Sequence, residues 1–513
     1  MKSINNIEIK KLELAQYFQL IEVMKAAYPN WKGSFWSEKS IEKIIEKFPE
    51  GQLVIIADSH IVGCALSIIV DYAEFGDAHN YKEITGNYSF ETHQTHGNML
   101  YGIEVFVHPD FRGLRLGRRL YEARKELCEK LNLEGIVFGG RIPNYHLHKN
   151  ELTPQKYIQK VKHKEIFDPV LTFQLSNDFH VKKILRNYIP NDFESDDNAI
   201  LLQWNNVYYI PDFKTVKKIR KSVRLGLVQW QMRLFSSVEE LFVQSEYFID
   251  SISTYKSDFA LFPVFFNAPL MKQFEHLSES DAMREVAQFT PIIKQKFSEM
   301  AIRYNVNIIC GSMPAYENGK FQNIGYLCHR NGLVEQYEKI HITPDETKYW
   351  GLEGGSVLKT FDTDAGKIGI LICYDVEFPE LSRLLSDEGM QILFVPFLTD
   401  THNAYMRVRL CAQARAVENE CYVAISGSTG NLPQVNNLDI NYSQSAVFTP
   451  CDFAFPFNGI KSEATPNTEM ILIADVDLKL LDELHSYGSV TNLKNRRKDF
   501  YTLKLTKDAR DIK

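Results

Sequence analysis

The chain has 513 residues, too many for one ordinary domain of about 150 residues, and this predicts two large domains or three small ones. Hydrophobic residues make up 44% and charged residues 24%, so the composition is globular and excludes a mostly disordered chain. The net charge of -7 and the pI near 6.1 argue against a protein that binds nucleic acid over its whole surface.

The distribution of particular residues excludes further classes. No apolar run approaches the ~20 residues of a membrane span, and the longest candidate, Ile61 to Val70, has the character of a strand. The first residues contain no apolar core, so we expect no secretory signal. The eight cysteines are scattered without a C-x-x-C pair, which indicates neither a disulfide scaffold nor a zinc site. We therefore expect a cytoplasmic protein with no metal and no association with membranes or nucleic acid.

The first third of the chain alternates between strand and helix patterns. Apolar residues at helical spacing predict a helix from Leu14 to Ala27, and Asp58-Ser59-His60 between two apolar runs predicts a hairpin. The other elements expected here are strands over Ile7–Leu12, Gln52–Ala57, Ile61–Val70, Met99–Val107 and Leu133–Phe138, and an amphipathic helix over Leu116–Leu131. This order predicts an α/β domain.

The pattern is interrupted between Trp204 and Arg224, where Pro211 is followed by a short basic run. The run consists of Lys214, Lys217, Lys218, Arg220 and Lys221. A solvated linker is the simpler interpretation, and a local anion-binding patch is the alternative. We place the domain boundary near residue 215, with one domain over residues 1–210 and a second over residues 222–505.

Apolar strands separated by long helices follow this boundary. Ser237-Val238-Glu239-Glu240 fits a capping box that opens a helix to about Tyr255. Pro291 should interrupt a helical stretch from about Asp281 to Tyr304, and Asn331-Gly332 predicts a hairpin. The remaining predictions are strands over Val223–Gln229, Phe259–Phe262, Val306–Cys310, Ile368–Cys373, Ile392–Val395 and Cys421–Ser426, and a helix over Ala404–Glu420. This is a second α/β domain.

In the first domain, a strand, a turn rich in Gly and Arg, and a helix follow one another between Glu104 and Leu120. A helix that begins in such a turn has unpaired backbone N–H groups at the positive end of its dipole, where they can bind a pyrophosphate. The guanidinium groups of Arg112, Arg115 and Arg118 can add charge-assisted contacts to phosphate. An ordinary basic helix start is the alternative.

This segment resembles the acyl-coenzyme-A-binding signature of the GNAT N-acetyltransferases, which reads Arg/Gln-x-x-Gly-x-Gly/Ala after the fourth strand. Arg112 matches its first element and Gly117 its last, whereas Arg115 replaces the middle glycine. The resemblance covers about residues 5–145 and implies a mixed-sheet α/β domain with acetyl-CoA or another acyl-CoA as co-substrate. The binding residues that it implies are Val105, Val107, Arg112, Gly113, Arg115, Gly117 and Arg118.

In GNAT enzymes an amine attacks the bound thioester directly. A carboxylate or water accepts the proton of the amine, and a tyrosine often protonates the departing thiolate. Glu104 is our candidate for water-mediated proton acceptance, Tyr145 and Tyr157 are candidates for the acid, and Asn144 is a candidate neighbour of the pantetheine arm.

Two residues in the second domain have the chemistry of a nucleophilic site. Cys373 stands where a buried strand meets a helix, so it can face a pocket, where nearby positive charge lowers a thiol pKa. Lys339 follows the Asn331-Gly332 hairpin, where a buried lysine can stabilise an oxyanion. Alone, Cys373 would more often be a core cysteine and Lys339 a surface strand residue, but their local contexts together favour a catalytic pair.

The segments around these residues closely resemble the nitrilase superfamily of carbon–nitrogen hydrolases, whose catalytic residues are Glu, Lys and Cys. Lys339 in Lys-Ile-His-Ile-Thr-Pro matches the lysine, and Cys373 in Ile-Cys-Tyr-Asp-Val-Glu-Phe-Pro-Glu matches the nucleophile. The resemblance covers about residues 222–505. It implies an α-β-β-α sandwich, small-molecule amide substrates and a homodimer formed through this domain, and a GNAT domain fused ahead of a nitrilase domain is a recognised order.

One element of the nitrilase pattern is missing. The catalytic Glu normally follows Phe-Pro at the end of the second strand, but here Val264 follows Phe262-Pro263. Valine cannot accept or donate a proton, and general acid–base catalysis of this kind is worth roughly 10²–10⁴-fold. Glu346 matches a second glutamate that supports the site in many family members, and it is a candidate for partial compensation.

Two readings of function remain open from the sequence. The leading one is a bifunctional protein, in which an acyl-CoA-dependent N-acyltransferase acting on an amine is joined to an amidase-type hydrolase impaired by Val264. The alternative makes the second domain a ligand-binding or scaffolding module without catalysis, attached to an active acetyltransferase. Nucleic-acid binding through the basic linker is a third reading that the net charge disfavours.

Overall fold

The structure is a computed structural model that describes residues 6–31, 33, 35–209, 222–317, 319–433, 435 and 438–505. The chain divides into two compact units, Met1–Lys217 and Lys218–Lys513, and each has its own hydrophobic core. The boundary expected near residue 215 and the basic run around it lie outside the described residues. In the part of the chain that is described, no helix is long and apolar enough to cross a membrane.

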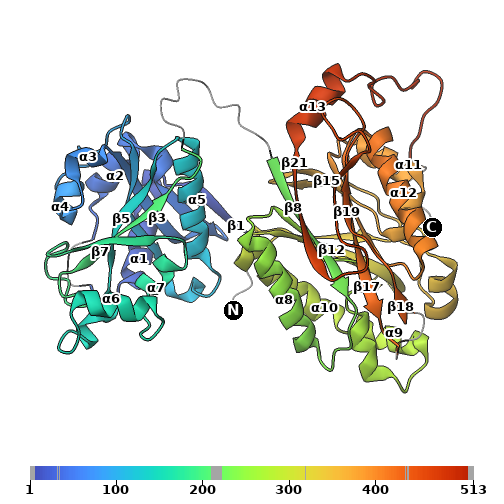
Figure 1. Ribbon diagram of the computed structural model, residues 1–513, viewed down its shortest axis with the longest axis horizontal. Coiled ribbons are helices and arrows are strands. Elements are labelled where there is room, and N and C mark those ends of the chain that lie inside the picture. The colour runs from blue at the N-terminus through green and yellow to red at the C-terminus, as the bar shows by residue number, and fades with distance from the viewer. Residues whose placement is uncertain are drawn as a thin grey trace. The chain divides into compact units, whose positions relative to one another are not determined.

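The first unit is a mixed sheet covered by helices (Figure 1). Its strands are β1 (Ile7–Lys11), β2 (Leu53–Ala57), β3 (His60–Val70), β4 (Met99–Val107), β5 (Gly135–Arg141), β6 (His180–Leu185) and β7 (Ala199–Asn205). Its helices are α1 (Tyr17–Ala27), α2 (Glu38–Lys47), α3 (Tyr72–Phe75), α4 (Tyr81–Ile84), α5 (Leu116–Lys130), α6 (Pro154–Lys162) and α7 (Leu171–Leu175). The strand order is β1-β2-β3-β4-β5-β7-β6, and only β4 and β5 are paired in parallel.

Most sequence predictions for this unit are confirmed, with shifted ends. The hairpin between β2 and β3 turns at Asp58 and Ser59, which both have positive φ as a tight two-residue turn requires. The helix expected from Leu14 begins as a 3₁₀ turn, Leu14–Gln16, and becomes α-helical at Tyr17. The strand expected from Leu133 begins at Gly135, because the Leu133 N–H still bonds to the carbonyl of Cys128 in the last turn of α5.

The second unit contains a long, mainly parallel strand series. Its strands are β8 (Ser222–Gln231), β9 (Phe259–Leu261), β10 (Asn307–Ile309), β11 (Met313–Glu317), β12 (Lys320–Cys328), β13 (Val334–Glu338), β14 (Phe361–Thr363), β15 (Gly366–Ile370), β16 (Ile392–Phe397), β17 (Tyr422–Asn431), β18 (Ile440–Asn441), β19 (Ala446–Phe448), β20 (Ile460–Glu463) and β21 (Met470–Asp477). Its helices are α8 (Val238–Thr254), α9 (Glu279–Ala287), α10 (Thr290–Tyr304), α11 (Pro379–Asp387), α12 (His402–Glu418) and α13 (Leu478–Tyr487).

The strands of this unit form two layers that pack face to face. Strands β10, β9, β8, β17, β16 and β15 are neighbours in that order and all parallel, so their carboxyl ends lie along one edge. Strands β8 and β17 share only the pairs Ser428–Trp230 and Thr429–Gln231. The strand series bends at this point, so that its two halves form the two layers. The rings of Phe259 and Phe394 lie 5.1 Å apart although two strands separate them in the series.

Helices cover the outside of this sandwich. Figure 1 shows α8 and α10 on one side of the strands and α11 and α12 on the other. The predicted break at Pro291 is confirmed, because α9 ends at Ala287 and α10 begins at Thr290. The capping box at Ser237 is only half formed: its side chain accepts the Glu240 N–H, but the Glu240 carboxylate accepts the N–H of Ser236. The strand expected to reach Cys373 ends at Ile370.

Candidate active sites

In the first unit, β4 and β5 separate part-way along their length. They pair only from Met99 to Tyr101, and the rest of β4 has no partner on the β5 side. A bulge opposite Leu66 and Ser67 bends β4 at this point. The buried guanidinium of Arg124, on α5, donates to the carbonyls of Leu66 at 2.9 Å and Glu104 at 2.5 Å. Arg124 therefore ties β3 and β4 to α5 beside this opening.

The predicted phosphate-binding turn connects β4 to α5. Gly113 has φ of +91°, and a Cβ built there would meet nothing within 4 Å, so the backbone is open to a ligand. Arg115, which replaces the middle glycine of the family signature, has φ of +53° and precedes the first residue of α5. Glycine adopts this left-handed conformation without steric cost, which explains the glycine of the family signature, whereas Arg115 adopts it at a steric cost. Arg112 donates to the carbonyl of Ala27 at 3.3 Å.

Glu104 lies on β4 at the mouth of this opening. Its carboxylate accepts the Tyr28 hydroxyl at 2.7 Å, and the same hydroxyl lies 3.2 Å from the carbonyl of Val105. Burial raises the pKa of Glu104, and the hydrogen bond from Tyr28 acts in the opposite direction. A carboxyl group with a raised pKa is suited to take up a proton near neutral pH.

The tyrosines considered as acids make other contacts. The Tyr145 hydroxyl donates to the carbonyl of Leu152 at 3.0 Å, and the Tyr157 hydroxyl donates to Asp168 at 2.7 Å. The Asn144 amide donates to the carbonyl of Phe167 at 3.2 Å. In this conformation neither hydroxyl is available to donate to a departing thiolate.

Sequence reasoning missed a charged cluster at the end of β5. Arg141 donates to Asp192 and, at 2.9 Å, to Glu194. The ring of Trp31 lies 5.5 Å from its guanidinium, and the Arg141 charge also acts on Glu104. The only signal in the sequence is an arginine at a strand end, because its partners follow about fifty residues later.

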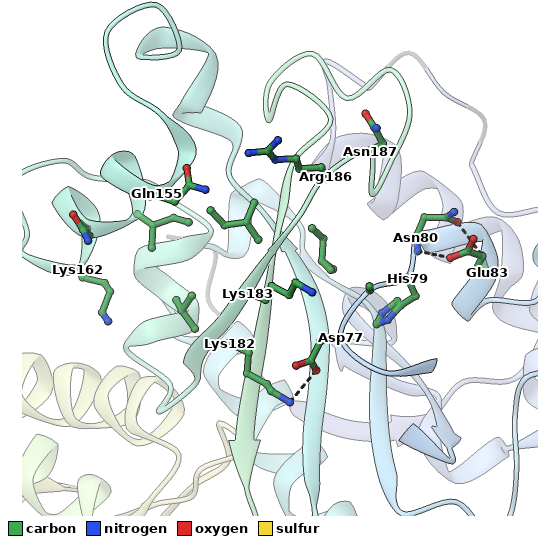
Figure 2. Close-up of a pocket in the computed structure, with 16 residues that line it drawn as sticks. Asp77, His79, Asn80, Glu83, Gln155, Lys162, Lys182, Lys183, Arg186 and Asn187 are labelled. Carbon is green, nitrogen blue, oxygen red and sulfur yellow. Dashed lines mark hydrogen bonds and ion pairs between the residues drawn. The ribbon is translucent and has the colours of Figure 1, made fainter. Parts of the chain in front are cut away.

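Figure 2 shows a pocket elsewhere on this unit, between α6, β6 and the segment from Asp77 to Glu83. Its volume is about 860 Å³, and Lys162, Lys183 and Arg186 line it together with an ion pair between Lys182 and Asp77. None of the predicted site residues lines it. Strand β6 is the last in the sheet order, and lysines on an outer strand hinder its pairing with another chain, which accounts for this basic surface.

In the second unit, Cys373 begins a 3₁₀ turn, Cys373–Glu377, just beyond β15. Its φ of +49° is left-handed, a strained conformation that is common at functional sites. The Sγ atom lies 3.5 Å from the carbonyl of Leu398, which follows β16. Burial raises the pKa of the Cys373 thiol, and the charge of Lys339 offsets this only in part.

Lys339 and Glu346 form a buried ion pair beside Cys373. The Lys339 Nζ donates to Glu346 Oε2 at 2.5 Å, and both side chains are buried. Burial acts to lower the pKa of Lys339, but the charges of Glu346 and Cys373 outweigh it and the pKa is raised. The Glu346 carboxylate also accepts from the Thr343 N–H at 2.9 Å, the Thr343 hydroxyl at 3.0 Å and the Asn323 amide at 3.3 Å. Glu346 is therefore placed to keep Lys339 charged and oriented.

Asp375 joins the loop of the lysine to the turn of the cysteine, and sequence reasoning missed this role. It is fully buried and accepts the backbone N–H groups of Ile340 at 3.0 Å and His341 at 2.7 Å. Arg415 on α12 supports the turn from the other side by donating to the carbonyl of Val376 at 3.0 Å. These contacts span more than thirty residues, so the only signal in the sequence was the presence of Asp375 two residues after Cys373.

Val264 lies three residues beyond β9, at the same edge of the sandwich. It forms an isolated parallel bridge with Ser312, whose carbonyl accepts the Phe265 N–H at 2.8 Å. Phe265 has φ of +51°, and its ring packs edge-on against Trp350 at 5.3 Å. Among the described residues, the buried Ser312 Oγ and Trp350 Nε1 have no hydrogen-bond partner. These contacts hold the turn that carries Val264 in place. Valine cannot form hydrogen bonds with the two polar atoms beside it.

Comparison with known proteins identifies the family of the second unit. The family model for carbon–nitrogen hydrolases matches residues 224–486. The chain is 44% identical over 507 residues, 98% of its length, to the probable hydrolase YhcX of Bacillus subtilis, of which the match covers 97%. The chain belongs to the carbon–nitrogen hydrolase family. This carbon–nitrogen hydrolase begins with a GNAT acetyltransferase domain, since the GNAT family model matches residues 17–150.

Other relatives match one part of this fused hydrolase. The uncharacterized N-acetyltransferase YkwB of Bacillus subtilis is 33% identical over 34% of the chain and 76% of its own length. The omega-amidase NIT2 of Homo sapiens is 28% identical over 56% of the chain and 99% of its own length. A solved structure of the Caenorhabditis elegans NitFhit protein aligns with a TM-score of 0.47 and 22% identity, over 55% of this chain and 66% of that one. The fusion of an acetyltransferase domain to a nitrilase-like hydrolase domain, expected from the sequence, is confirmed.

Proposed function

We propose that this chain is bifunctional: an acyl-CoA-dependent N-acyltransferase joined to an amidase-type carbon–nitrogen hydrolase whose proton transfers are impaired. The observation that carries the hydrolase half is the buried group of Cys373, Lys339 and Glu346, held together through Asp375. Acyl transfer to a protein thiol requires a nucleophile beside a buried positive charge that stabilises the oxyanion.

In the hydrolase half, the thiolate of Cys373 attacks the amide carbon and Lys339 stabilises the negative charge on the carbonyl oxygen. The bond to the amine breaks, the amine must gain a proton to leave, and a thioester on Cys373 remains. Water then attacks this thioester, gives up a proton and releases the acid. Val264 stands where a carboxylate would move these protons, and Glu346 is engaged by Lys339, Thr343 and Asn323.

In the acyltransferase half, the turn before α5 and its arginines bind the pyrophosphate of acetyl-CoA or another acyl-CoA. Val105 and Val107 border the pantetheine arm on the side of β4 that has no strand partner. Gly113, Gly117 and Arg118, at the start of α5, continue the binding surface toward the phosphates. Glu104 accepts the proton of the attacking amine, directly or through water, since its pKa is raised by burial. The acyl group then forms an amide with the amine, and the free thiol of CoA departs.

The substrates and setting follow from the same chemistry. Relatives named as amidases support a small-molecule amide as the substrate of the hydrolase. The match to the GNAT family supports a small amine as the acceptor of the acyltransferase. Cys373 must stay reduced to act as a nucleophile, which favours the cytoplasm. Neither half calls for a metal, a nucleic acid or a membrane, and we propose a homodimer through the second unit.

The test of the hydrolase half is a covalent adduct on Cys373, detected by mass spectrometry after incubation with simple aliphatic amides. An adduct absent from Cys373→Ala supports catalysis, whereas noncovalent amide binding without any adduct or product supports the ligand-binding alternative. Isothermal titration with acetyl-CoA tests the other half. Binding that Arg112→Glu weakens strongly supports it, and binding indifferent to that change contradicts it.

A further inference from the structure

The hydrolase site retains two of the three groups that its chemistry needs. Cys373 is held in its strained turn, and Lys339 is held charged by Glu346. Among the described carboxylates near Cys373, Asp375 binds the backbone of Ile340 and His341, and Glu377, whose pKa is raised by burial, lies 3.7 Å from Arg407. The site can therefore form a bond to a carbonyl carbon and stabilise the oxyanion, but with valine at position 264 it lacks the carboxylate that would deliver a proton to a leaving amine from there.

Leaving groups differ greatly in their need for that proton. An amine cannot leave as an anion, so amide cleavage depends on general acid help worth roughly 10²–10⁴-fold. A thiol leaves as a thiolate, which is stable in water because thiol pKa values are about 8.5. In thiol exchange at sulfur and carbonyl centres alike, the ease of departure follows the pKa of the leaving thiol. A site without the carboxylate is thus selective against amides and permissive toward thioesters.

We propose that Cys373 accepts acyl groups from small acyl thioesters and retains them as an S-acyl cysteine. This inference rests on the proposed roles of Cys373 and Lys339. The Cys373 thiolate forms a bond to the carbonyl carbon of the thioester while Lys339 stabilises the oxyanion. The bond to the donor sulfur then breaks, and the donor leaves as a thiolate that gains from solvent the proton that Cys373 lost.

The acylated form persists for the same structural reason. Release of the acid needs a base to activate water, and the base position is filled by Val264, which is buried among apolar side chains. The donor class also agrees with the rest of the chain, because the GNAT domain implies that acyl thioesters are its co-substrates. An acyl thioester is therefore a reactant that both halves of one chain can use.

The test uses the full chain and the acetyl thioester of N-acetylcysteamine, a small donor that lacks the nucleotide of CoA. We expect intact mass spectrometry at mildly alkaline pH to show one added acetyl group, mapped to Cys373, formed at least about 10²-fold faster than any adduct from acetamide. Cys373→Ala should lose the label, and Lys339→Met should slow it. The matched control is Cys451→Ala, which removes an exposed thiol and should keep the label.

The outcomes separate this inference from the function on which it rests. In Val264→Glu the restored base should make the acetyl adduct transient and raise amide hydrolysis. If that variant hydrolyses amides but the unaltered chain is never acetylated on Cys373, the thioester proposal is wrong and the hydrolase assignment stands. If neither occurs, both are wrong. Equal labelling by thioester and amide would also overturn the proposed selectivity.

Discussion

Our proposal for the hydrolase site depends on position 264, because Cys373, Lys339 and Glu346 form one buried group and only the expected carboxylate is replaced. Sequence comparison with the family pattern predicted Cys373, Lys339 and Glu346, since each lies in a short, distinctive stretch, and the structure places all three in one buried group. The roles of Asp375 and Arg415 could not be predicted in the same way. They depend on hydrogen bonds to loops far away in sequence, and local patterns carry no information about such partners.

Val264→Glu should raise amidase activity by roughly 10²-fold or more, because it restores a proton acceptor beside a preformed nucleophile and oxyanion site. The Ser312 hydroxyl and Trp350 N–H, which have no hydrogen-bond partner in the described part of the chain, border the turn and can donate to the new carboxylate. The attraction of Lys339 would help to keep it ionised. The measurement is hydrolysis of a panel of simple aliphatic amides, with Cys373→Ala as the blank.

Equal rates in the two forms would contradict this prediction and leave two explanations. Glu346→Gln in the unaltered background separates them. A further drop in activity would mean that Glu346 already serves as the base, although its four contacts argue that it positions Lys339. No change would mean that the site is inactive for another reason.

Alkylation of Cys373 by iodoacetamide should accelerate steadily from neutral to strongly alkaline pH. The thiolate is the reactive form, and the pKa of Cys373 is raised by burial and by Glu346 and Glu377, against the lowering effect of Lys339. Below that pKa the thiolate fraction rises about tenfold per pH unit, so the rate should follow the same slope. A rate that is already maximal at neutral pH, measured by mass spectrometry with Cys373→Ala as control, would show a depressed pKa instead.

At the scale of elements, most strands and helices could be predicted because their apolar periodicity or their turn residues are strong. Asp58-Ser59 and Asn331-Gly332 both form the expected turns, and Pro291 separates two helices as expected. Element ends were harder to predict. The apolar run before Cys373 continues to Ile372, yet the strand ends at Ile370, because the chain turns there into the 3₁₀ turn that begins at Cys373. The separation of β4 and β5 was also hidden, since their pairing stops at Tyr101 beside a bulge in β4 that no local pattern reveals.

Arg115→Gly should have opposite effects on stability and ligand binding. Arg115 is left-handed, at a cost of about 1 kcal/mol that glycine does not have, so the change should stabilise the first unit by roughly that amount. It also removes a guanidinium from the turn that we assign to the pyrophosphate, so acetyl-CoA affinity should fall and depend less on salt. Calorimetric unfolding measures the change in stability, and the transition that acetyl-CoA shifts is assigned to the first unit. Titration with acetyl-CoA measures the change in affinity.

A loss of stability in Arg115→Gly would show that contacts of this side chain outweigh its backbone strain. Unchanged affinity would place the phosphates elsewhere. Gly113→Ala is the matched control on the same turn, because it introduces strain at a φ of +91° without altering charge. It should lower stability, which is the reverse of the effect expected for Arg115→Gly.

At the scale of the whole molecule, the chain joins two units with separate cores, and each matches its own family model. The second unit exposes apolar side chains on and beside α12. Leu410 is 58% exposed and Phe457 is 95% exposed, and Val417 lies two turns along α12 from Leu410. Gln413 on the same helix donates to the carbonyl of Asn458 at 2.6 Å, which holds Phe457 beside α12. We call Leu410, Val417 and Phe457 the α12 patch.

We predict that the chain is a homodimer whose interface includes the α12 patch. Contiguous exposed apolar side chains mark association surfaces, and homodimer interfaces are more apolar than the remaining surface. Leu410→Glu combined with Phe457→Glu places two charges in a contact that excludes water, so light scattering at micromolar concentration should show a shift toward the 59.3 kDa monomer. Phe18→Glu, at an exposed position of the first unit, should leave the dimer intact. A monomer in the unaltered chain would overturn the prediction, and a dimer that survives the double change would place the interface on another face of the second unit.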